Sequence, residues 1–385
     1  MMAAATIRSM GRICFLALAL AASGAQALDT VDFQVATEDA QLIRALKAAS
    51  VILAAERDGQ TDAQDILSDG RAEYGALLNA LYARGHYSAV IHVYADGREV
   101  AAIPPLDAPA RIDRIQITVD PGPRFALSRA TVRPLPNRPN LPNGFRIGAP
   151  AESGVIVAAA GAAVEGWRGQ GNAKAKVTAQ DIVADHASAT LSADIQIAPG
   201  PVLRFGRLTV TGQDRMREGR ILKIAGLPEG ERFDPAELDR AAARLRRTGV
   251  FTSVSLAEDA AITPPDYLGI TATVVEQKPR RYSLGAELGS LDGLTLSGTW
   301  LHRNLMGGAE RLELGAEVTN IGSGTSGVDY TLGAKLDRPA TFSPDTNLGL
   351  AVEFGHLDEA DFYADVASTS VTLSHVFSPR RRAGR

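Results

Sequence analysis

The chain has 385 residues, whereas a single domain usually has about 100–200, so several modules are expected. Its formal net charge is −4 and aromatic residues make up only 5% of it. Such a chain lacks both the basic field that attracts nucleic acid and the aromatic side chains that stack on bases. We therefore expect no nucleic-acid partner.

The first 27 residues have the three parts of a secretory signal peptide. Positive charge at Arg8 and Arg12 precedes an apolar core of ten residues, Ile13 to Ala22. Ala25 and Ala27 then place small residues at positions −3 and −1 of a cleavage site after Ala27. A buried N-terminal helix is the alternative, but an apolar core of this length is too short to span a bilayer. We expect residues 1–27 to be an export signal.

The only cysteine, Cys14, lies inside this signal. The mature chain is therefore expected to have no disulfide, no thiolate metal ligand and no thiol nucleophile, and to be held together by burial alone. An exported chain without cysteine suits the bacterial cell envelope. No other apolar run is long enough for a membrane-spanning helix, so any membrane insertion would have to use strands.

A helix-to-strand corner occurs three times, in "YARGHYSAVIHV", "WRGQGNAKAKV" and "RRTGVFTSVSL". The corners align on Gly85, Gly169 and Gly249, which are 84 and 80 residues apart. A second marker, the proline at 121, 199 and 279, repeats after 78 and 80 residues. Two markers with one period predict three repeated modules, each opening with a strand, continuing as helix, turning at the glycine and closing with two strands.

The third repeat shows the pattern most clearly. Asp234 is expected to cap a helix that has Pro235 at its first position and Glu237 at N3, an Asp version of the capping box. Gly249 would end this helix in the left-handed conformation. Strands are predicted at 204–212, 251–256 and 268–275. The apolar stripe of the helix is expected at Leu238, Ala241, Ala242 and Leu245.

The first and second repeats carry weaker versions of the same pattern. In the first, helix is expected from about Asp39, with strands at 90–94 and 112–119; in the second, the closing strand is expected at 189–197. The helical stripes are Tyr74, Leu77, Leu78 and Leu81 in the first, and Ile156, Ala160, Ala163 and Trp167 in the second. A helix pair laid on a small sheet buries one face of each, which predicts three α+β modules in a row.

The repeated glycines have one alternative interpretation, as loops that cradle a phosphate. No Gly-Lys-Ser/Thr follows them, so helix termination is the preferred interpretation. The proline-glycine-proline turns between repeats are expected to act as semi-rigid joints, because proline fixes φ.

After Pro279 the pattern changes to strict alternation of apolar and polar residues. Strands are predicted at 282–289, 294–301, 311–318, 330–336, 347–354 and 367–377, separated by turn-rich segments. An apolar row opposite charged residues fits lipid on one side and water on the other, although a soluble antiparallel sandwich alternates equally well. The candidate lipid-facing residues are Tyr282, Leu284, Leu288, Leu312, Leu314 and Val318.

In this order the features resemble the TamA family, within the superfamily of outer-membrane assembly factors that includes BamA. The resemblance rests on the three corners, on "IAGLPEGERFDPAELDRA", and on "RNLMGGAERLELGAEV", which resembles an early barrel hairpin. It implies three POTRA (polypeptide-transport-associated) repeats at 28–120, 121–201 and 202–279, followed at 280–385 by the N-terminal part of an antiparallel transmembrane β-barrel.

The barrel segment departs from the family pattern. From Tyr282 to Arg385 there are 104 residues, room for about six strands, whereas the family's barrel has about sixteen. The family's late Arg-Gly-Phe-type element has no match, and the chain stops at "SPRRRAGR" without a closing aromatic strand. An open sheet edge in hydrocarbon leaves backbone groups unsatisfied, so a truncated family member, with a shifted reading frame near its end, is the expectation.

The resemblance also implies a function and partners. The protein would aid the insertion of β-barrel proteins and autotransporters into the outer membrane of a Gram-negative bacterium, with its POTRA modules in the periplasm. Module edges would bind extended clients by β-augmentation, and the strand at 282–289 would template client strands. Implied partners are a TamB-like periplasmic protein anchored in the inner membrane, unfolded outer-membrane clients and outer-membrane lipid.

Two other function classes remain as alternatives. An exported hydrolase would need a catalytic motif, but the sequence has no Gly-x-Ser-x-Gly elbow and no His-Glu-x-x-His site. Of the six histidines only His86 and His92 are close in sequence. We therefore predict no enzyme activity, no catalytic or metal site and no cofactor. The third hypothesis is a soluble periplasmic scaffold that keeps its POTRA modules while the barrel segment stays unfolded or is degraded.

Overall fold

The computed structural model describes residues 30–105, 107, 109–290, 293–324, 327–358 and 361–377. The expected signal peptide with Ala25 and Ala27, and the basic tail from residue 378, lie outside the described residues. The chain forms two compact units. One holds the chain up to Ala130 with 144–156 and 182–192, and the other holds 131–143, 157–181 and everything from Ala193 onward.

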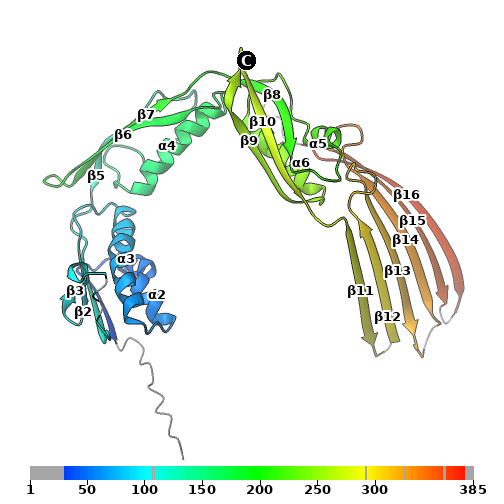
Figure 1. Cartoon of the computed structure of the whole chain (residues 1–385), viewed down its shortest axis with the longest axis horizontal. Coiled ribbons are helices and arrows are strands. Elements are labelled where there is room, and N and C mark those ends of the chain that lie inside the picture. Colours follow the sequence, from blue (N-terminus) through cyan, green and yellow to red (C-terminus); the bar gives the residue numbers. More distant parts are fainter. Residues whose placement is uncertain are drawn as a thin grey trace, which may run out of the picture. The chain divides into compact units, whose positions relative to one another are not determined.

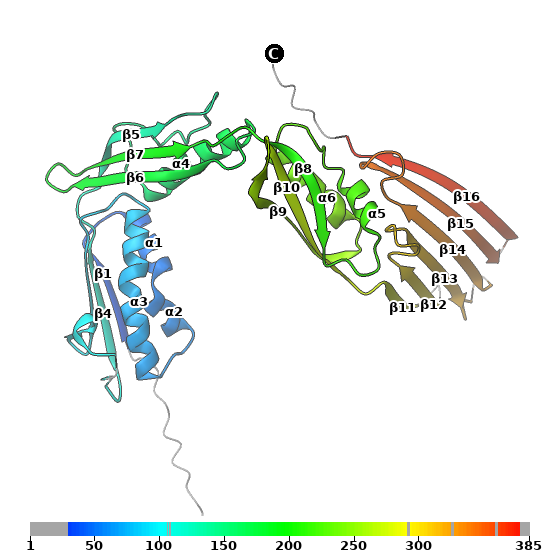
Figure 2. The same ribbon diagram turned by 45° about the horizontal axis from the view of Figure 1, so that its top comes forward.

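The first module combines a four-stranded sheet with three helices on one of its faces (Figures 1 and 2). The sheet order is β1-β4-β2-β3, with β1 parallel to β4 and the other pairs antiparallel. Its strands are β1 (Thr30–Val35), β2 (Val90–Ala95), β3 (Arg98–Glu99) and β4 (Arg114–Asp120). Its helices are α1 (Ala40–Ala49), α2 (Val51–Arg57), α3 (Ala63–Tyr82) and the 3-10 turn η1 (Val100–Ala102).

Helix caps explain where the helices of this module begin. The Asp39 carboxylate accepts hydrogen bonds from the backbone N–H groups of Gln41 (2.8 Å) and Leu42 (3.1 Å), which confirms the expected start of helix at Asp39. A second carboxylate, the fully buried Glu73 of α3, accepts from the first two N–H groups of α2 at 2.6 and 3.0 Å. Burial raises the pKa of Glu73 because it disfavours the charged form.

An aromatic cluster ties the end of α3 to the next segment within the same unit. The Tyr87 ring stacks on Tyr82 at 4.7 Å and meets Phe125 edge-on at 5.5 Å. The Tyr87 hydroxyl donates to the Ala151 carbonyl at 2.8 Å, and the Phe125 N–H donates to the Gly85 carbonyl at 2.8 Å. These directional contacts hold the segment around the first proline-glycine-proline turn against the helix end.

The second module, shared between the two units, has a three-stranded sheet of order β5-β7-β6 and one helix. The elements are β5 (Ala126–Arg133), α4 (Ser153–Arg168), β6 (Lys176–Asp185) and β7 (Thr190–Ala198). The predicted closing strand is confirmed as β7. The buried side chains of α4 are Ile156, Ala159, Ala160 and Ala163, so three of the four predicted stripe residues are buried and Trp167 is half-buried.

The third module has a sheet of order β8-β10-β9 and two helices. The elements are β8 (Arg204–Thr211), α5 (Glu218–Ala225), α6 (Pro235–Arg247), β9 (Phe251–Thr263) and β10 (Tyr267–Glu276). The predicted strands and the α6 stripe are confirmed, since Ala241, Ala242 and Leu245 are buried and Leu238 packs against the core. The sequence pattern did not locate α5.

The predicted capping box at the start of α6 is half right. The Asp234 carboxylate caps the helix by accepting from the Ala236 N–H at 2.9 Å. Glu237 does not complete the box: its carboxylate accepts a hydrogen bond from Arg240 at 3.0 Å instead, one turn further along the helix. A charged partner three residues away competes successfully with the distant backbone N–H.

The predicted glycine corners are correct at two places and shifted at the third. Gly85 and Gly249 adopt φ values of +85° and +66° just after their helices, as a left-handed helix stop requires. Gly169 follows α4 directly without positive φ, and Gly171, at φ +88°, makes the left-handed turn two residues later. The alignment on Gly169 is therefore wrong by two residues, because α4 is followed by a further hydrogen-bonded turn.

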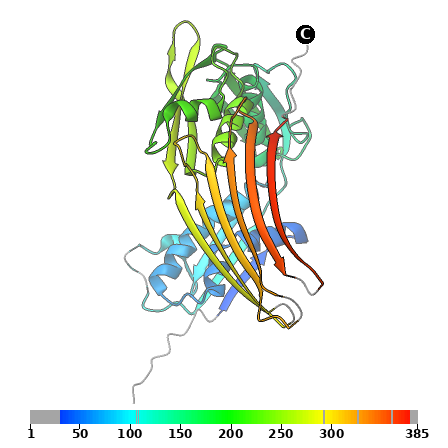
Figure 3. The same ribbon diagram turned by 90° about the vertical axis from the view of Figure 1, so that its right-hand side faces the viewer.

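All six strands predicted after Pro279 are confirmed, and they form one antiparallel meander (Figure 3). Each strand pairs with the next along the chain. The strands are β11 (Arg280–Gly289), β12 (Gly293–His302), β13 (Arg311–Ile321), β14 (Asp329–Arg338), β15 (Thr346–Asp358) and β16 (Tyr363–His375). Within the described part of the chain no helix is both long enough and apolar enough to cross a bilayer.

Two substitutions test whether Gly171, rather than Gly169, makes the left-handed turn after α4. Gly171→Ala should destabilise the protein by about 1–2 kcal/mol, because an alanine at φ +88° is strained and its Cβ would lie 2.9 Å from Arg232 Cγ. Gly169→Ala should be neutral or slightly stabilising, since the nearest neighbour of its Cβ is 3.4 Å away. Urea unfolding followed by circular dichroism measures both. Equal losses in the two variants would contradict the corrected corner.

Candidate functional site

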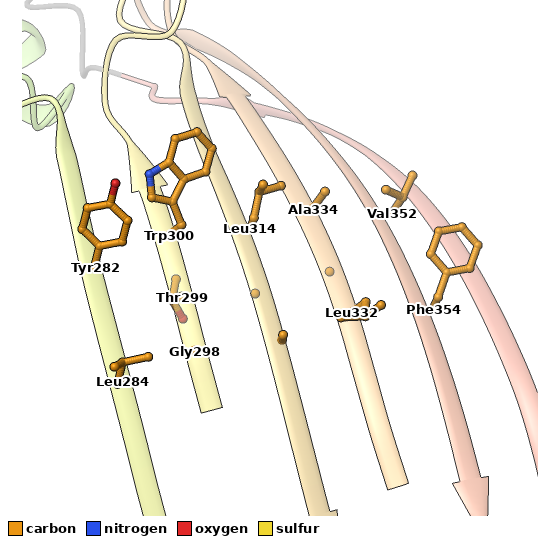
Figure 4. Close-up of a pocket in the computed structure, with 13 residues that line it drawn as sticks. Tyr282, Leu284, Gly298, Thr299, Trp300, Leu314, Leu332, Ala334, Val352 and Phe354 are labelled. Atoms are coloured by element: carbon orange, nitrogen blue, oxygen red, sulfur yellow. The ribbon is translucent and has the colours of Figure 1, made fainter. Parts of the chain in front are cut away.

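The six-stranded sheet has one face on which two successive rows are apolar across β11 to β15. Register places Tyr282, Trp300, Leu314, Ala334 and Val352 in one such row across β11 to β15. Leu284, Gly298, Ala316, Leu332 and Phe354 form the next. Residues of both rows line a shallow hollow of about 790 Å³ (Figure 4).

All six candidate lipid-facing residues lie on this apolar face. Tyr282, Leu284 and Leu288 come from alternate positions of β11, and Leu312, Leu314 and Val318 from alternate positions of β13. The strands bring the two sets together because Tyr282 pairs with Trp300 and Trp300 with Leu314. The structure thus places all six predicted residues on one face of the sheet.

The apolar face is exposed to a degree that is unusual for a folded protein. Leu284 is 91% exposed and Leu288 is 81% exposed, and both belong to the edge strand β11. Leu332 and Phe354, in the middle of the face, are still 54% and 59% exposed. A continuous apolar surface of this kind marks an interaction surface, since isolated apolar side chains are normal but large patches are not.

The opposite face of the same sheet is polar. One row contains Arg281, Glu313, Lys335 and Ser370 with two apolar residues, and the next contains Ser283, Thr299, Glu353 and Ser368 with two glycines. Because successive side chains of a strand point to opposite faces, the alternation along each strand yields this division. The sheet therefore has one apolar face and one polar face.

Strands β11 and β16 form the two edges of the sheet. Among the described residues no other strand pairs with the outer side of either one. Each edge strand presents a row of backbone N–H and C=O groups that can pair with another chain. Edge strands of 10 and 13 residues are long enough for such pairing.

Two turns of the sheet pack into the core of the third module, within one compact unit. Ala309, between β12 and β13, and Ala340, between β14 and β15, are 1% and 0% exposed and belong to the same apolar cluster as Phe205 and Ile221. Both alanines have positive φ, of 64° and 48°. The turns are thus part of the hydrophobic core of the third module.

A buried arginine of α5 binds the backbone of both turns. The Arg220 guanidinium donates to the Pro339 carbonyl at 2.7 Å and to the Gly308 carbonyl at 3.2 Å. Glu310, 1% exposed, lies beside it and accepts from the Gly308 N–H at 2.8 Å. Turn carbonyls have no strand partner, so a guanidinium with several donors satisfies groups that burial would otherwise leave unpaired.

An ion pair joins α6 to the second turn. The Arg244 guanidinium donates to both carboxylate oxygens of Asp345, at 2.9 and 2.6 Å, and Arg247 adds a contact at 3.4 Å. The side chains of Arg244 and Asp345 are only 9% and 17% exposed. The hydrogen bond from Arg244 is the main cause that holds the pKa of Asp345 below its ordinary value of 3.8.

Gly226, in the sequence "IAGLPEG", lies too close to another segment of the chain to carry a side chain. Gly226 ends α5 at φ +58°, and a Cβ at this position would overlap Pro344 of the second turn. Glycine is therefore required both by the backbone conformation and by the space left between α5 and the sheet. This role was not apparent from the sequence, since Pro344 is more than one hundred residues away.

The described residues contain no group of three or more His, Cys, Asp or Glu side chains that could hold a metal ion. His86 and His92, the two histidines close in sequence, have separate partners. His86 Nδ1 lies 3.2 Å from the Gly122 carbonyl, and His92 Nδ1 lies 3.2 Å from the Glu99 carboxylate. The structure does not bring them together into one site.

The sequence profile described as "Surface antigen variable number repeat", the POTRA family, matches residues 203–277. The third module is a POTRA domain. Helices α5 and α6, the β8-β10-β9 sheet and the Gly249 corner therefore make up the POTRA domain that holds the six-stranded sheet. No curated protein sequence gives a significant match to the chain.

Several solved structures are similar to parts of this chain. BamA from Haemophilus ducreyi lacking POTRA domains 1-3 is similar with a TM-score of 0.52 and 17% identity, covering 65% of this chain and 47% of that chain. BamA POTRA3-5 from Haemophilus influenzae gives 0.41 and 17%, covering 54% of this chain and 80% of that chain. CdiB from Acinetobacter baumannii gives 0.42 and 11%, covering 67% and 51%.

The likeness to the first of these structures is a likeness of fold. POTRA-like α/β domains followed by a strand-rich region resemble part of a BamA barrel with its adjoining POTRA domains. The chain spans about half the length of that BamA chain, whose coverage is 47%.

The ion pair between Arg244 and Asp345, which joins the POTRA domain to the sheet and is called the junction, should make the stability of the protein sensitive to acid. Asp345→Asn should lower the free energy of unfolding by roughly 2–3 kcal/mol at neutral pH, because Arg244 loses a charged partner inside a nearly buried contact. The pKa of Asp345 is depressed in the folded state, so its contribution is fully present above the unfolded value near 3.8 and is lost as the pH falls through the lower folded value. The difference in stability between wild type and variant should therefore shrink as the pH falls below 3.8.

Asp266→Asn is the matched control for this experiment. Asp266 pairs with Arg204 at 3.2 Å in the same POTRA domain, but the two side chains are 36% and 51% exposed. Exposed pairs contribute about 0–1 kcal/mol, so this variant should lose little. Urea unfolding of detergent-solubilised protein between pH 3 and 8 provides the comparison, and equal losses in both variants would show that the junction is not special.

Proposed function

We propose that the chain is an outer-membrane assembly factor of the TamA type, with its six-stranded sheet in lipid and three POTRA modules in the periplasm of a Gram-negative bacterium. The observation that carries this proposal is the exposed apolar face backed by a polar face and fixed to a POTRA domain. In water such a face costs about 25 cal/mol for every Å² of apolar surface left exposed. Contact with lipid acyl chains removes this cost, because they are apolar as well. The long antiparallel strands suit a barrel wall.

The assembly activity would use the edges of the sheet. An edge strand in hydrocarbon leaves backbone groups without partners, at several kcal/mol each, so β11 and β16 are driven to pair with further strands. The backbone of a client strand would pair with the backbone of β11. The register of this pairing would place the client's apolar side chains on the apolar face and its polar side chains on the polar face. β-barrel proteins, including autotransporters, are the client class.

The α/β modules would hold extended clients and a partner in the periplasm. The edge strand β6 is exposed along almost its whole length, with Ile182 and Val183 at 44% and 55% exposure. Such an edge suits β-augmentation by an unfolded client. By the same resemblance a TamB-like protein would dock on the first module. Neither an enzyme activity nor a cofactor is part of this proposal.

Membrane embedding is tested by fractionating cells that express the chain. The proposal expects the mature protein to stay with the outer membrane after extraction with alkaline carbonate and to be released by detergent, because its apolar face needs a hydrophobic environment. Heating in detergent should also change its gel mobility as the sheet unfolds. Recovery of a heat-insensitive protein in the soluble periplasmic fraction would instead support the scaffold hypothesis.

Templating on β11 is tested with single cysteines on the polar face. The sequence contains one cysteine, Cys14, which lies in the expected signal, so an introduced cysteine would be the sole thiol of the mature chain. Glu287→Cys on the edge strand should form disulfides with an unfolded outer-membrane barrel protein that carries one cysteine in its first strand. Glu317→Cys on the interior strand β13 is the control. This strand already pairs with β12 on one side and β14 on the other, so no client strand can pair with it. Equal cross-linking at the two positions would contradict the proposal.

A further inference from the structure

The two turns that pack on the POTRA domain also carry exposed apolar side chains. Phe342 is 76% exposed, Met306 57% and Leu305 40%, although Ala309 and Ala340 of the same turns are buried. Each turn therefore has one side in the POTRA core and another side that presents large apolar groups to the surroundings. The core contact does not require these exposed groups, so they call for a separate explanation.

Basic side chains of the POTRA domain lie directly beside these apolar groups. Lys223 Nζ is 3.4 Å from the carbonyl of Thr341, the residue before Phe342. Arg217 Nε is 3.4 Å from the carbonyl of Gly307, the residue after Met306. Both basic side chains are exposed, and Glu218 is the acidic residue next to them in sequence. Each turn that carries exposed apolar side chains thus has a basic side chain of the POTRA domain close to it.

The apolar face of the sheet ends in arginines at the same end. Arg280 lies opposite His302 in the row that continues to Leu312 and Leu336, and Arg338 lies opposite Leu348 one row beyond. Both arginines are exposed. Arg338 forms a long ion pair, at 3.9 Å, with the buried Glu310. The face therefore changes from apolar to basic at the level where the turns begin.

The far end of the same face has the opposite charge. There Asp365 pairs with His356 at 2.6 Å, and Asp358 lies opposite Tyr363. On the described part of this face the two arginines occupy the POTRA end and these two aspartates occupy the other. Charge is thus sorted along the strand direction, which a simple need for solubility would not produce.

We propose that the POTRA end of the sheet binds the anionic headgroups of membrane phospholipids. The binding surface, called the rim surface, consists of Leu305, Met306, Phe342, Arg217, Lys223, Arg280 and Arg338. Apolar side chains enter the boundary between acyl chains and headgroups, while cations beside them attract lipid phosphates. The inference rests on the proposed function, because the sheet places this surface at headgroup level only if its apolar face lies in lipid.

The rim surface would add an electrostatic anchor to the apolar one. The two turns hold the POTRA domain rigidly through Arg220 and Arg244, so lipid bound at the rim fixes the height of the POTRA domain as well as that of the sheet. The electrostatic anchor depends on lipid charge and is weakened by screening as ionic strength rises, whereas burial of the apolar face does not rely on charge attraction. This difference in sensitivity separates the two contributions in an experiment.

The test compares vesicle binding by the full chain after removal of two rim cations. Vesicles of phosphatidylcholine alone and vesicles with added phosphatidylglycerol are the probes, and co-flotation measures the bound fraction. Wild type should bind the anionic vesicles more tightly, and Arg217→Gln with Lys223→Gln should reduce that binding on the order of tenfold or more, since each surface cation contributes to attraction by anionic lipid. Binding to neutral vesicles should be unchanged.

Matched variants separate the charge of the rim from its structure. Lys176→Gln with Arg207→Gln removes two exposed cations on β6 and β8, away from the turns, and should have little effect. Arg217→Lys with Lys223→Arg keeps the charge and should bind like wild type. Urea unfolding of each variant checks that the turns still pack. Equal loss in the Lys176 and Arg207 control, or equal binding of wild type to both vesicles, overturns the proposal.

Carbonate extraction of the same vesicles distinguishes failure of this inference from failure of the proposed function. A chain that resists carbonate in both vesicles but shows no preference for anionic lipid is membrane-embedded without a lipid-binding rim. A chain that is stripped by carbonate, yet binds anionic vesicles through Arg217 and Lys223, has the rim but not the embedded sheet. Phe342→Ser with Met306→Ser should weaken binding to both kinds of vesicle if these side chains enter the lipid boundary.

Discussion

The pleat of the β-strand is the constraint on which the rest of this structure depends. Successive side chains point to opposite faces, so six alternating strands in the observed register place apolar and polar residues on separate faces. A shift of one residue in any strand would send its apolar residues to the polar face. The row from Tyr282 to Val352 thus exists only because every turn of the meander keeps the register.

The POTRA domain and the sheet are joined through groups that burial would otherwise leave unsatisfied. Arg220 offers its donors to turn carbonyls, and Arg244 is matched by Asp345 in a nearly dry contact. Removing one partner from such a contact costs more than the contact contributes when intact, because the remaining charge stays buried. The junction is therefore specific to these turns, and the POTRA core is completed by Ala309 and Ala340 from the sheet.

Much of the local structure could be predicted because its causes lie within a few residues. Asp234 beside Pro235 starts a helix, Gly249 ends it, and alternation over eight residues predicts a strand. The incorrect predictions also have local causes. One more turn after α4 moved the left-handed glycine from 169 to 171, and Arg240 competed for Glu237. Helix α5 escaped prediction because eight residues carry little periodicity.

By itself the sequence determined the alternation of six strands, the helix-to-strand corners and the set of apolar residues that share a face. These are properties of a segment and its near neighbours, set by backbone geometry and side-chain period. Only the tertiary structure decided that Pro344 requires Gly226, that Arg220 binds two turns and that basic side chains lie beside Met306 and Phe342. Those contacts join residues about one hundred positions apart, and no local pattern encodes which distant groups meet when separate elements pack.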